Sequence, residues 1–178
     1  MSPYNEAMGQ EHEFDIVIAG GGMVGTSLAR LLADIGTGSR PCRIALLDRV
    51  AFEPDRTLFH VQPERYDPRV SALTQASKAL FSELKIWRYI VDMRQCPYGE
   101  MHVWDAEGTG SIQFRAHEVH QPDLGSIVEN SVISSALHQG LNEQSNLTYF
   151  APFNLTSVKR DESGTLLIGS EDGSAVRA

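Results

Sequence analysis

The stretch from Phe14 to Asp48 constrains the fold of this 178-residue chain more than any other. A short apolar run, Phe14–Ala19, is typical of a buried strand and leads into a G-x-G-x-x-G pattern. Helical spacing of apolar residues predicts a helix over Thr26–Ile35, and a second apolar run predicts a strand over Ile44–Leu47. The connection between them, Gly36–Arg43, is long and should bulge at the surface. The sequence therefore predicts a βαβ unit with a glycine-rich first turn.

This βαβ unit has the parts of a dinucleotide-binding site. Gly20 permits the tight turn, Gly22 lets a pyrophosphate approach the backbone, and Gly25 lets the helix pack closely on the strand. The helix N-terminus offers free N–H groups and about half a positive charge to phosphates. Asp48 follows the second strand, where it can accept a hydrogen bond from a ribose hydroxyl. The alternative, a glycine-rich turn without a ligand, does not explain this carboxylate.

Composition and charge exclude several classes of function. The formal net charge is −8, which argues against nonspecific nucleic-acid binding. The chain has no run of about 18 apolar residues that would span a membrane. The polar N-terminus, Met1–His12, lacks the features of a signal peptide and is expected to be disordered. Cys42 and Cys96 match no metal-ligand spacing, so we expect a reducing, cytoplasmic setting.

In the middle of the chain, the spacing of apolar residues changes from a helical pattern to the alternation of strands. Val50–Pro68 is predicted to be a long loop because it is polar and contains prolines. A helix is expected over Ser71–Trp87, followed by a second short helix over Trp87–Met93. Alternation then predicts a hairpin with strands Glu100–Asp105 and Ser111–Arg115. Two of its aromatic side chains, His102 and Trp104, either border a substrate pocket or pack against a neighbouring sheet. His117 and His120 do not have the spacing of a zinc helix, so no metal site is predicted.

The last third of the chain is predicted to return to mixed elements. We expect a strand over Leu124–Val128, a helix over Asn130–Leu141 and a strand over Leu147–Phe150. Three short strands follow, at Asn154–Arg160, Thr165–Gly169 and Ser174–Ala178. Because the pattern stops within a strand, we expect this chain to be a fragment of a longer protein.

Four segments resemble the N-terminal part of the FAD-dependent aromatic hydroxylases of ubiquinone biosynthesis, within the class A flavoprotein monooxygenases. The first segment is common to many FAD and NAD enzymes, whereas the second and fourth together are more specific. The segments are DIVIAGGGMVG (Asp15–Gly25), DPRVSALTQAS (Asp67–Ser77), PYGEMHVWDAEGTGSIQF (Pro97–Phe114) and LGSIVENSVISSAL (Leu124–Leu137).

The resemblance implies an α/β fold with a Rossmann-like FAD-binding βαβ unit of the glutathione-reductase type, an inserted β-hairpin and an incomplete C-terminus. Residues 13–96 would form the first part of the FAD-binding domain. Residues 97–118 would form a hairpin that belongs to the substrate domain, and residues 119–178 would continue the FAD-binding domain. The family's Asp-Gly and Gly-Asp motifs are expected beyond Ala178, because Asp172-Gly173 is predicted to be a hairpin turn.

The resemblance also implies which residues bind the cofactor. The glycine turn would hold the ADP part of FAD, together with an acidic residue that is usually glutamate in the family and is Asp48 here. Arg69 would lie near the cofactor, and the fourth segment would pass beside the flavin at Val128, Glu129 and Asn130. Alternatively, Arg69 forms an ordinary surface ion pair, and Glu129 and Asn130 cap a helix. The residues assigned to the turn are Gly20, Gly22, Met23, Val24 and Gly25.

The activity that the resemblance implies is hydroxylation of the aromatic ring of a polyprenylphenol in ubiquinone biosynthesis. NAD(P)H would reduce FAD, and O₂ would form a flavin hydroperoxide that attacks the ring; no catalytic triad is expected, and no catalytic residue is assigned. Expected partners are the polyprenylated phenol and other ubiquinone-biosynthesis proteins. Peripheral contact with the inner membrane and assembly into an oligomer are also compatible with the resemblance. Two alternatives stay open: another FAD-dependent oxidoreductase such as an oxidase, and an inactive truncated module that self-associates through an open sheet edge.

Overall fold

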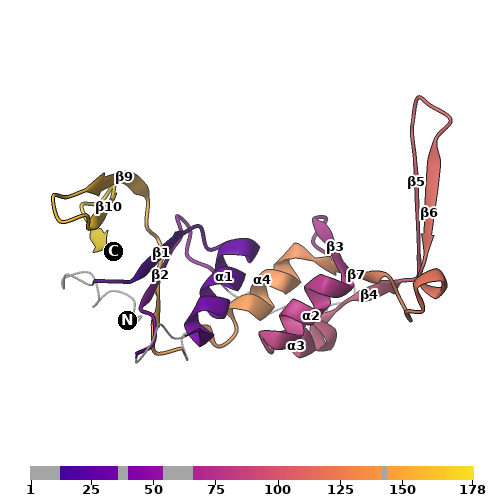
Figure 1. The fold of residues 1–178 in the computed structure, drawn as a ribbon, viewed down its shortest axis with the longest axis horizontal. Coiled ribbons are helices and arrows are strands. Elements are labelled where there is room, and N and C mark those ends of the chain that lie inside the picture. The colour runs from indigo at the N-terminus through magenta and orange to yellow at the C-terminus, as the bar shows by residue number, and fades with distance from the viewer. Residues whose placement is uncertain (1–12, 36–39, 54–65, 142–143) are drawn as a thin grey trace. The chain divides into compact units, whose positions relative to one another are not determined.

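The structure is a computed structural model that describes residues 13–35, 40–53, 66–141 and 144–178. It divides into two compact units (Figure 1): unit 1 comprises residues 1–54 and 137–178, and unit 2 comprises residues 55–136. The predicted disordered N-terminus lies outside the described residues. So do residues 36–39 of the predicted surface connection and residues 54–65 of the predicted long loop.

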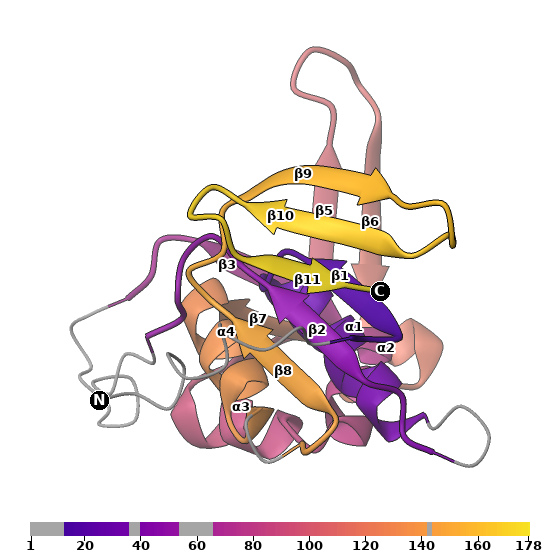
Figure 2. The same ribbon diagram turned by 90° about the vertical axis from the view of Figure 1, so that its left-hand side faces the viewer.

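The predicted βαβ unit is present in unit 1. Strand β1 (Ile16–Ala19) leads into helix α1 (Met23–Asp34), and strand β2 (Ile44–Leu47) pairs with β1 in parallel. A third parallel strand, β8 (Leu147–Phe150), pairs with the other edge of β2, which gives the order β1-β2-β8 (Figure 2). The helix begins at Met23 rather than Thr26, because Gly22 already has the extended backbone of an N-cap. The Rossmann-like fold is thereby confirmed.

Strand β2 is fully buried, as expected for the central strand of a parallel sheet covered on both faces. Alternate side chains point to opposite faces, so Ile44 and Leu46 pack with Ala29 of α1. Ala45 and Leu47 belong to a second cluster on the other face. The remaining buried members of that second cluster are Phe14, Phe153, Ile168 and Val176.

A small antiparallel sheet in unit 1 supplies part of this second cluster. It consists of β9 (Leu155–Arg160), β10 (Leu166–Ser170) and β11 (Ala175–Arg177), as the sequence predicts, in the order β11-β10-β9. Ile168 of β10 and Val176 of β11 are paired residues that project into the same core. The Phe14 N–H donates to the carbonyl of Arg177 at 2.9 Å. The segment that leads into β1 therefore runs along the outer edge of β11.

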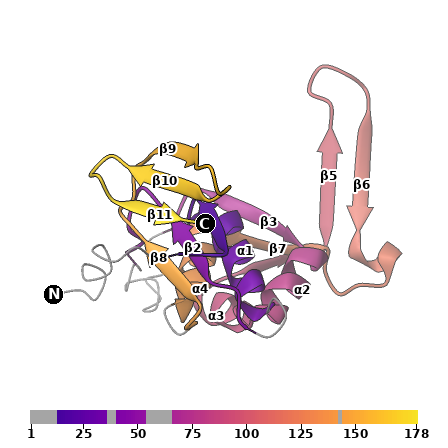
Figure 3. The same cartoon turned by 60° about the vertical axis from the view of Figure 1, so that its left-hand side comes forward.

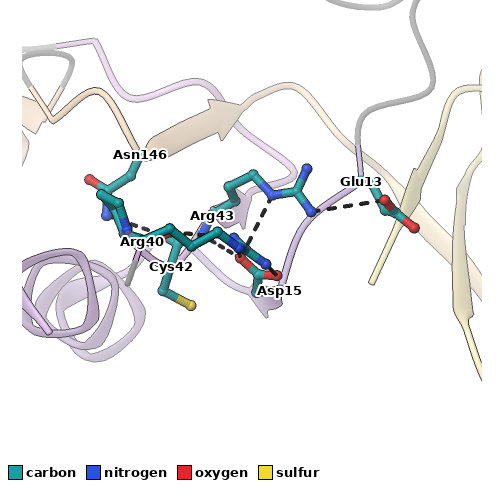
Figure 4. Close-up of polar contacts among 7 residues, drawn as sticks. Glu13, Asp15, Arg40, Cys42, Arg43 and Asn146 are labelled. Atoms are coloured by element: carbon teal, nitrogen blue, oxygen red, sulfur yellow. Dashed lines mark hydrogen bonds and ion pairs between the residues drawn. The ribbon is translucent and has the colours of Figure 1, made fainter. Parts of the chain in front are cut away.

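A cluster of charges joins the chain segments at the amino ends of β1 and β2 (Figure 4). The Arg40 guanidinium donates to both carboxylate oxygens of Asp15, at 2.6 and 2.7 Å, and the Arg43 N–H donates to the same carboxylate at 2.8 Å. These contacts hold the pKa of the Asp15 carboxyl far below its ordinary value, chiefly through the Arg40 hydrogen bond. Asn146 ties the approach to β8 to the same end, because its amide donates to the Cys42 carbonyl at 3.0 Å.

Unit 2 contains a three-stranded antiparallel sheet in the order β3-β7-β4. Helices α2 (Gln75–Glu83) and α3 (Trp87–Met93) follow β3 along the chain. Ile86, directly before α3, and Ile90, within α3, are completely buried. The strands of the sheet are β3 (Val70–Thr74), β4 (Cys96–Tyr98) and β7 (Gly125–Glu129).

The predicted single helix over Ser71–Trp87 is wrong. Residues up to Thr74 form β3, because they pair along their whole length with β7, a partner that the local spacing does not reveal. The Thr74 side chain accepts a hydrogen bond from the Ser77 N–H, so it caps α2 as its N-cap residue. Lys85, with φ 59°, separates α2 from α3. The second predicted helix, α3, is confirmed.

The predicted hairpin is also present in unit 2. Strand β5 (Glu100–Trp104) pairs with β6 (Ser111–Arg115), and a short 3₁₀ helix, η3 (Ala116–Val119), follows (Figure 3). Paired residues lie on the same face, and one face carries four exposed apolar side chains. They are Met101, Val103, Ile112 and Phe114.

Trp104, on the other face of the hairpin, is 66% exposed and contacts the His102 ring, at 5.4 Å between centroids. The described residues therefore show no neighbouring sheet packed on Trp104. Helix α4 (Asn130–His138) follows β7 and runs from unit 2 into unit 1, ending before the predicted Leu141.

Candidate dinucleotide-binding site

The glycine turn of unit 1 follows the carboxyl end of β1, where ligands of parallel α/β sheets bind. Gly20 has φ 113°, a conformation that side-chain-bearing residues rarely adopt, and its N–H donates to the Leu47 carbonyl at 2.7 Å. A Cβ atom on Gly25 would fall on the Gly20 carbonyl oxygen. Glycine at position 25 is therefore required by the close approach of α1 to the turn, as the sequence predicts.

Gly22 differs from these two glycines because it faces open space. A Cβ atom built on Gly22 would meet no other atom within 4 Å, and its backbone is extended, with φ −72°. Within the described residues, no side chain caps α1 at Gly22, and the first turn of the helix carries no acidic residue. Val24 in this turn is 84% exposed. The turn thus leaves both room and uncapped helix N–H groups for an anion such as a phosphate.

Asp48 points toward the glycine turn. Its Oδ2 accepts a hydrogen bond from the Gly21 N–H at 2.6 Å, and its Oδ1 accepts one from the Val50 N–H at 3.1 Å. A carboxylate oxygen can accept more than one hydrogen bond, so the group can still bind a ligand hydroxyl. The structure therefore brings Gly20, Gly22, Gly25 and Asp48 together in unit 1.

Gly21 is a residue that the sequence-based reasoning missed. A Cβ atom on Gly21 would lie 2.7 Å from Asp48 Oδ2 and 3.2 Å from the Tyr149 ring. Any larger residue would push the carboxylate away from the turn. The run of three glycines at positions 20–22 was the available signal, since the motif itself requires only two of them.

The candidate residues of unit 2 lie on or directly beside β3 and β7, which pair in antiparallel register: Arg69 precedes β3, Val128 is in β7, and Asn130 begins α4. The Arg69 side chain is 79% exposed, and its Nε lies 3.4 Å from Asp67 Oδ1. A hydrogen bond from the Arg69 backbone N–H, and then the Arg69 charge, lower the pKa of Asp67 below its ordinary value. Arg69 thus forms the surface ion pair that the sequence left open, and its contact with a cofactor stays a prediction.

Val128 and Asn130 are fixed within unit 2. Val128 is 1% exposed, and the Asn130 side-chain oxygen accepts a hydrogen bond from the Ser71 hydroxyl at 2.7 Å. The N-terminus of α4 receives a cap from elsewhere, because the Ser131 N–H donates to Asp67 Oδ2 at 3.3 Å. The alternative in which Glu129 and Asn130 cap the helix is therefore not what this contact shows, because the cap of Ser131 comes from Asp67, 64 positions before it.

Glu129 forms a buried ion pair that the sequence did not predict. Its side chain is 7% exposed, and Arg94 reaches it at 2.6 Å through Nε and at 2.9 Å through Nη2. The Asp67 N–H donates to the same carboxylate at 2.8 Å, and the Tyr66 ring lies 4.3 Å from the Arg94 guanidinium. This pair connects α3, β7 and the segment before β3. No sequence motif marks Arg94 as the partner of Glu129.

Neither a metal-ion cluster nor a membrane-spanning helix is present among the described residues. They contain no group of three or more His, Cys, Asp or Glu side chains arranged to hold a metal ion. Among these residues, every helix is also too short or too polar to cross a bilayer.

The relatives of the chain are enzymes of ubiquinone biosynthesis. Over 133 residues the chain is 38% identical to the mitochondrial ubiquinone biosynthesis monooxygenase COQ6 of Danio rerio, a match that covers 75% of the chain and 26% of that protein. Over 148 residues it is 34% identical to the 3-demethoxyubiquinol 3-hydroxylase of Escherichia coli K12, covering 83% of the chain and 35% of the enzyme. The chain belongs to this family of ubiquinone-biosynthesis monooxygenases. It spans about a quarter to a third of the length of these relatives. No family model matches it.

Solved structures of FAD-dependent monooxygenases share the fold of this family member. PqsL of Pseudomonas aeruginosa, a probable FAD-dependent monooxygenase, superposes with a TM-score of 0.65 over 93% of the chain and 40% of its own, at 17% identity. The p-nitrophenol 4-monooxygenase PnpA of Pseudomonas putida gives 0.64 over 95% of the chain and 39% of its own, at 15% identity. The flavin-dependent monooxygenase PieE, solved with FAD and substrate, also gives 0.64, over 94% of the chain and 29% of its own, at 17% identity.

Proposed function

We propose that this chain supplies the FAD-binding part of a monooxygenase that hydroxylates the aromatic ring of a polyprenylphenol in ubiquinone biosynthesis. The observation that carries the proposal is the turn of unit 1, where Asp48 faces the glycines and the space at Gly22 is open. This geometry fits a dinucleotide with a pyrophosphate and a ribose. Membership of the ubiquinone-biosynthesis family makes FAD the preferred dinucleotide, with NAD(P)H and O₂ as co-substrates.

The residues of unit 1 would bind the ADP half of FAD. The backbone N–H groups of Met23, Val24 and Gly25 lie at the uncapped start of α1 and would receive the pyrophosphate. Asp48 would accept a hydrogen bond from the adenosine ribose. When bound, FAD supplies the redox chemistry of the reaction, while the protein orients the reactants and excludes water.

The residues of unit 2 would act at the flavin and substrate side. Arg69 is exposed and projects from the start of β3, so it is available to an anionic group of the cofactor. Val128 and Asn130 would lie beside the flavin. Residues 97–118 would belong to the substrate domain, and the exposed apolar face of the β5–β6 hairpin supports this assignment because such a face requires an apolar neighbour.

The proposal extends to the setting of the enzyme. A polyprenylated phenol partitions into membranes, so contact with the inner membrane, with other ubiquinone-biosynthesis proteins, or with further copies of the enzyme would deliver it. These partners follow from the substrate class rather than from a surface of the described residues.

The decisive experiment uses the full-length protein. Purified enzyme should show the visible absorption of bound FAD, and it should convert a short-chain polyprenylphenol to a product heavier by one oxygen atom when NAD(P)H and air are supplied. In the Gly22→Val variant, the new side chain would occupy the open space of the turn, so the protein should fold but lack FAD. Full FAD occupancy in Gly22→Val would contradict the assignment of the turn. Consumption of NAD(P)H with hydrogen peroxide as the sole product would instead indicate an oxidase.

A further inference from the structure

Tyr149 ties together the residues that follow Asp48. This tyrosine lies on β8, and its hydroxyl donates to the Val50 carbonyl at 3.3 Å. The same hydroxyl accepts a hydrogen bond from the Phe52 N–H at 3.2 Å. One side-chain oxygen thus binds both ends of the short segment from Val50 to Phe52. Tyr149 lies 99 positions after Val50 in the sequence.

This segment in turn holds the Asp48 carboxylate. The Val50 N–H donates to Asp48 Oδ1 at 3.1 Å, while Gly21 binds Oδ2. The backbone of Asp48 is also fixed to the strand that carries Tyr149, because its N–H donates to the Phe150 carbonyl at 2.9 Å. A continuous path of hydrogen bonds therefore runs from the Tyr149 hydroxyl through Val50 to the carboxylate.

Two further aromatic rings hold this arrangement in place. The His138 ring stacks on Phe52 with 3.9 Å between centroids and an interplanar angle of 16°. The same histidine meets the Tyr149 ring edge to face at 5.6 Å. The Tyr149 ring also lies beside Gly21, where a Cβ atom would approach it to 3.2 Å. Tyr149 therefore lies beside Gly21 and is hydrogen-bonded to Val50, the two residues whose N–H groups bind the Asp48 carboxylate.

We infer that Tyr149 is a positioning residue for the nucleotide: through Val50 it holds the Asp48 carboxylate in the orientation that receives the ribose hydroxyl. The inference rests on the proposed binding of FAD in the turn. Without the hydroxyl, the Val50–Phe52 segment loses its two hydrogen bonds to Tyr149, so the Val50 N–H is held less firmly against the carboxylate. FAD should then bind more weakly, although the Asp48 side chain itself is unchanged.

The test is a double-mutant cycle on FAD binding in the full-length protein. The dissociation constant of FAD would be measured by flavin fluorescence for the wild type, Tyr149→Phe, Asp48→Ala and the double variant. Tyr149→Phe keeps the ring and removes one hydroxyl, and we expect it to weaken binding by about threefold to tenfold. In the Asp48→Ala background the same change should have no further effect, because the group that Tyr149 positions is gone. A merely structural role would weaken both backgrounds equally.

Tyr89→Phe is the matched control, since it removes a hydroxyl that accepts only an exposed hydrogen bond from Arg88 in the described part of unit 2. It should leave the dissociation constant unchanged. Normal FAD binding by Tyr149→Phe, or effects that multiply in the double variant, would overturn the inference and leave the proposed function intact. A wild-type protein that binds no FAD would overturn both.

Discussion

The glycine turn of unit 1 and the β3–β7 region of unit 2 both carry candidate cofactor residues, but different forces fix them. In the turn, backbone sterics decide: Gly25 has no room for a Cβ atom, and Gly20 has a positive φ. In the β3–β7 region, side-chain charges decide: the buried Glu129 holds Arg94 and the Asp67 N–H. The comparison shows that missing side chains fix the first region, whereas a buried ion pair fixes the second.

The two regions should also differ in how well they tolerate amino-acid substitutions. The steric requirement at Gly25 is strict, because a single added carbon atom would meet the Gly20 carbonyl oxygen. This backbone oxygen cannot move unless the end of β1 moves with it. An ion pair can be replaced as a whole by apolar side chains, since its Coulomb energy is offset by the cost of desolvation. Substitutions in each region can therefore test the comparison directly.

The largest effect is expected for Gly25→Ala. The new methyl group would collide with the Gly20 carbonyl and separate α1 from β1, so we expect a loss of more than about 4 kcal/mol in the free energy of unfolding. Denaturant unfolding followed by circular dichroism would measure it. Gly22→Ala is the control. Its methyl group would enter open space, so its free energy of unfolding should equal that of the wild type. Equal stability of the two variants would show that the turn is not sterically fixed.

The next effect is expected for Glu129→Leu. This change leaves Arg94 without its buried partner and should cost about 3 kcal/mol of stability, the lower end of the range for broken buried pairs, because the Arg94 side chain keeps 23% exposure. Adding Arg94→Met to this variant should recover much of the loss. Thermal or denaturant unfolding of both variants would show whether the double change restores stability. No recovery would mean that Glu129 acts through its other contact, with the Asp67 N–H.

A smaller effect is expected for Asp48→Ala, on cofactor binding rather than on folding. Loss of a charged hydrogen-bond acceptor should weaken FAD by about 1.5–3 kcal/mol, or roughly ten- to 150-fold in the dissociation constant. Titration of the cofactor-free, full-length variant with FAD would give this value. An unchanged dissociation constant would assign the ribose to another residue.

The smallest effect is expected for Asp15→Asn, at the opposite end of the sheet from the glycine turn. Arg40 and Arg43 lower the pKa of Asp15, so the folded state keeps the carboxylate charged below its ordinary pKa of 3.8. The wild type should therefore be slightly more stable than Asp15→Asn above pH 3.8, and this advantage should shrink as the pH falls below that value. Melting temperatures from pH 7 to pH 2 would test it, and an advantage that is as large at pH 2 as at pH 7 would contradict the assignment. Cofactor binding should not change.

The elements that depend on local residue patterns could be predicted from the sequence. Glycines at fixed spacing, apolar runs of strand length and turn residues predicted the βαβ unit, the β5–β6 hairpin and the strands β9, β10 and β11, because each of these forms from neighbouring residues. The same reasoning failed at β3, where helical spacing of Leu73 with later residues was outweighed by pairing with β7.

Contacts between groups that are far apart in the sequence follow from the tertiary fold and could not be predicted. Asp67 caps α4 across 64 positions, Arg94 pairs with Glu129 across 35, and Tyr149 holds Val50 across 99. None of these pairs has a sequence signature, because a hydrogen bond between side chain and backbone needs no particular residue at the backbone position, and opposite charges are common everywhere on a chain. The fold chooses among many chemically equivalent partners by bringing one of them within reach.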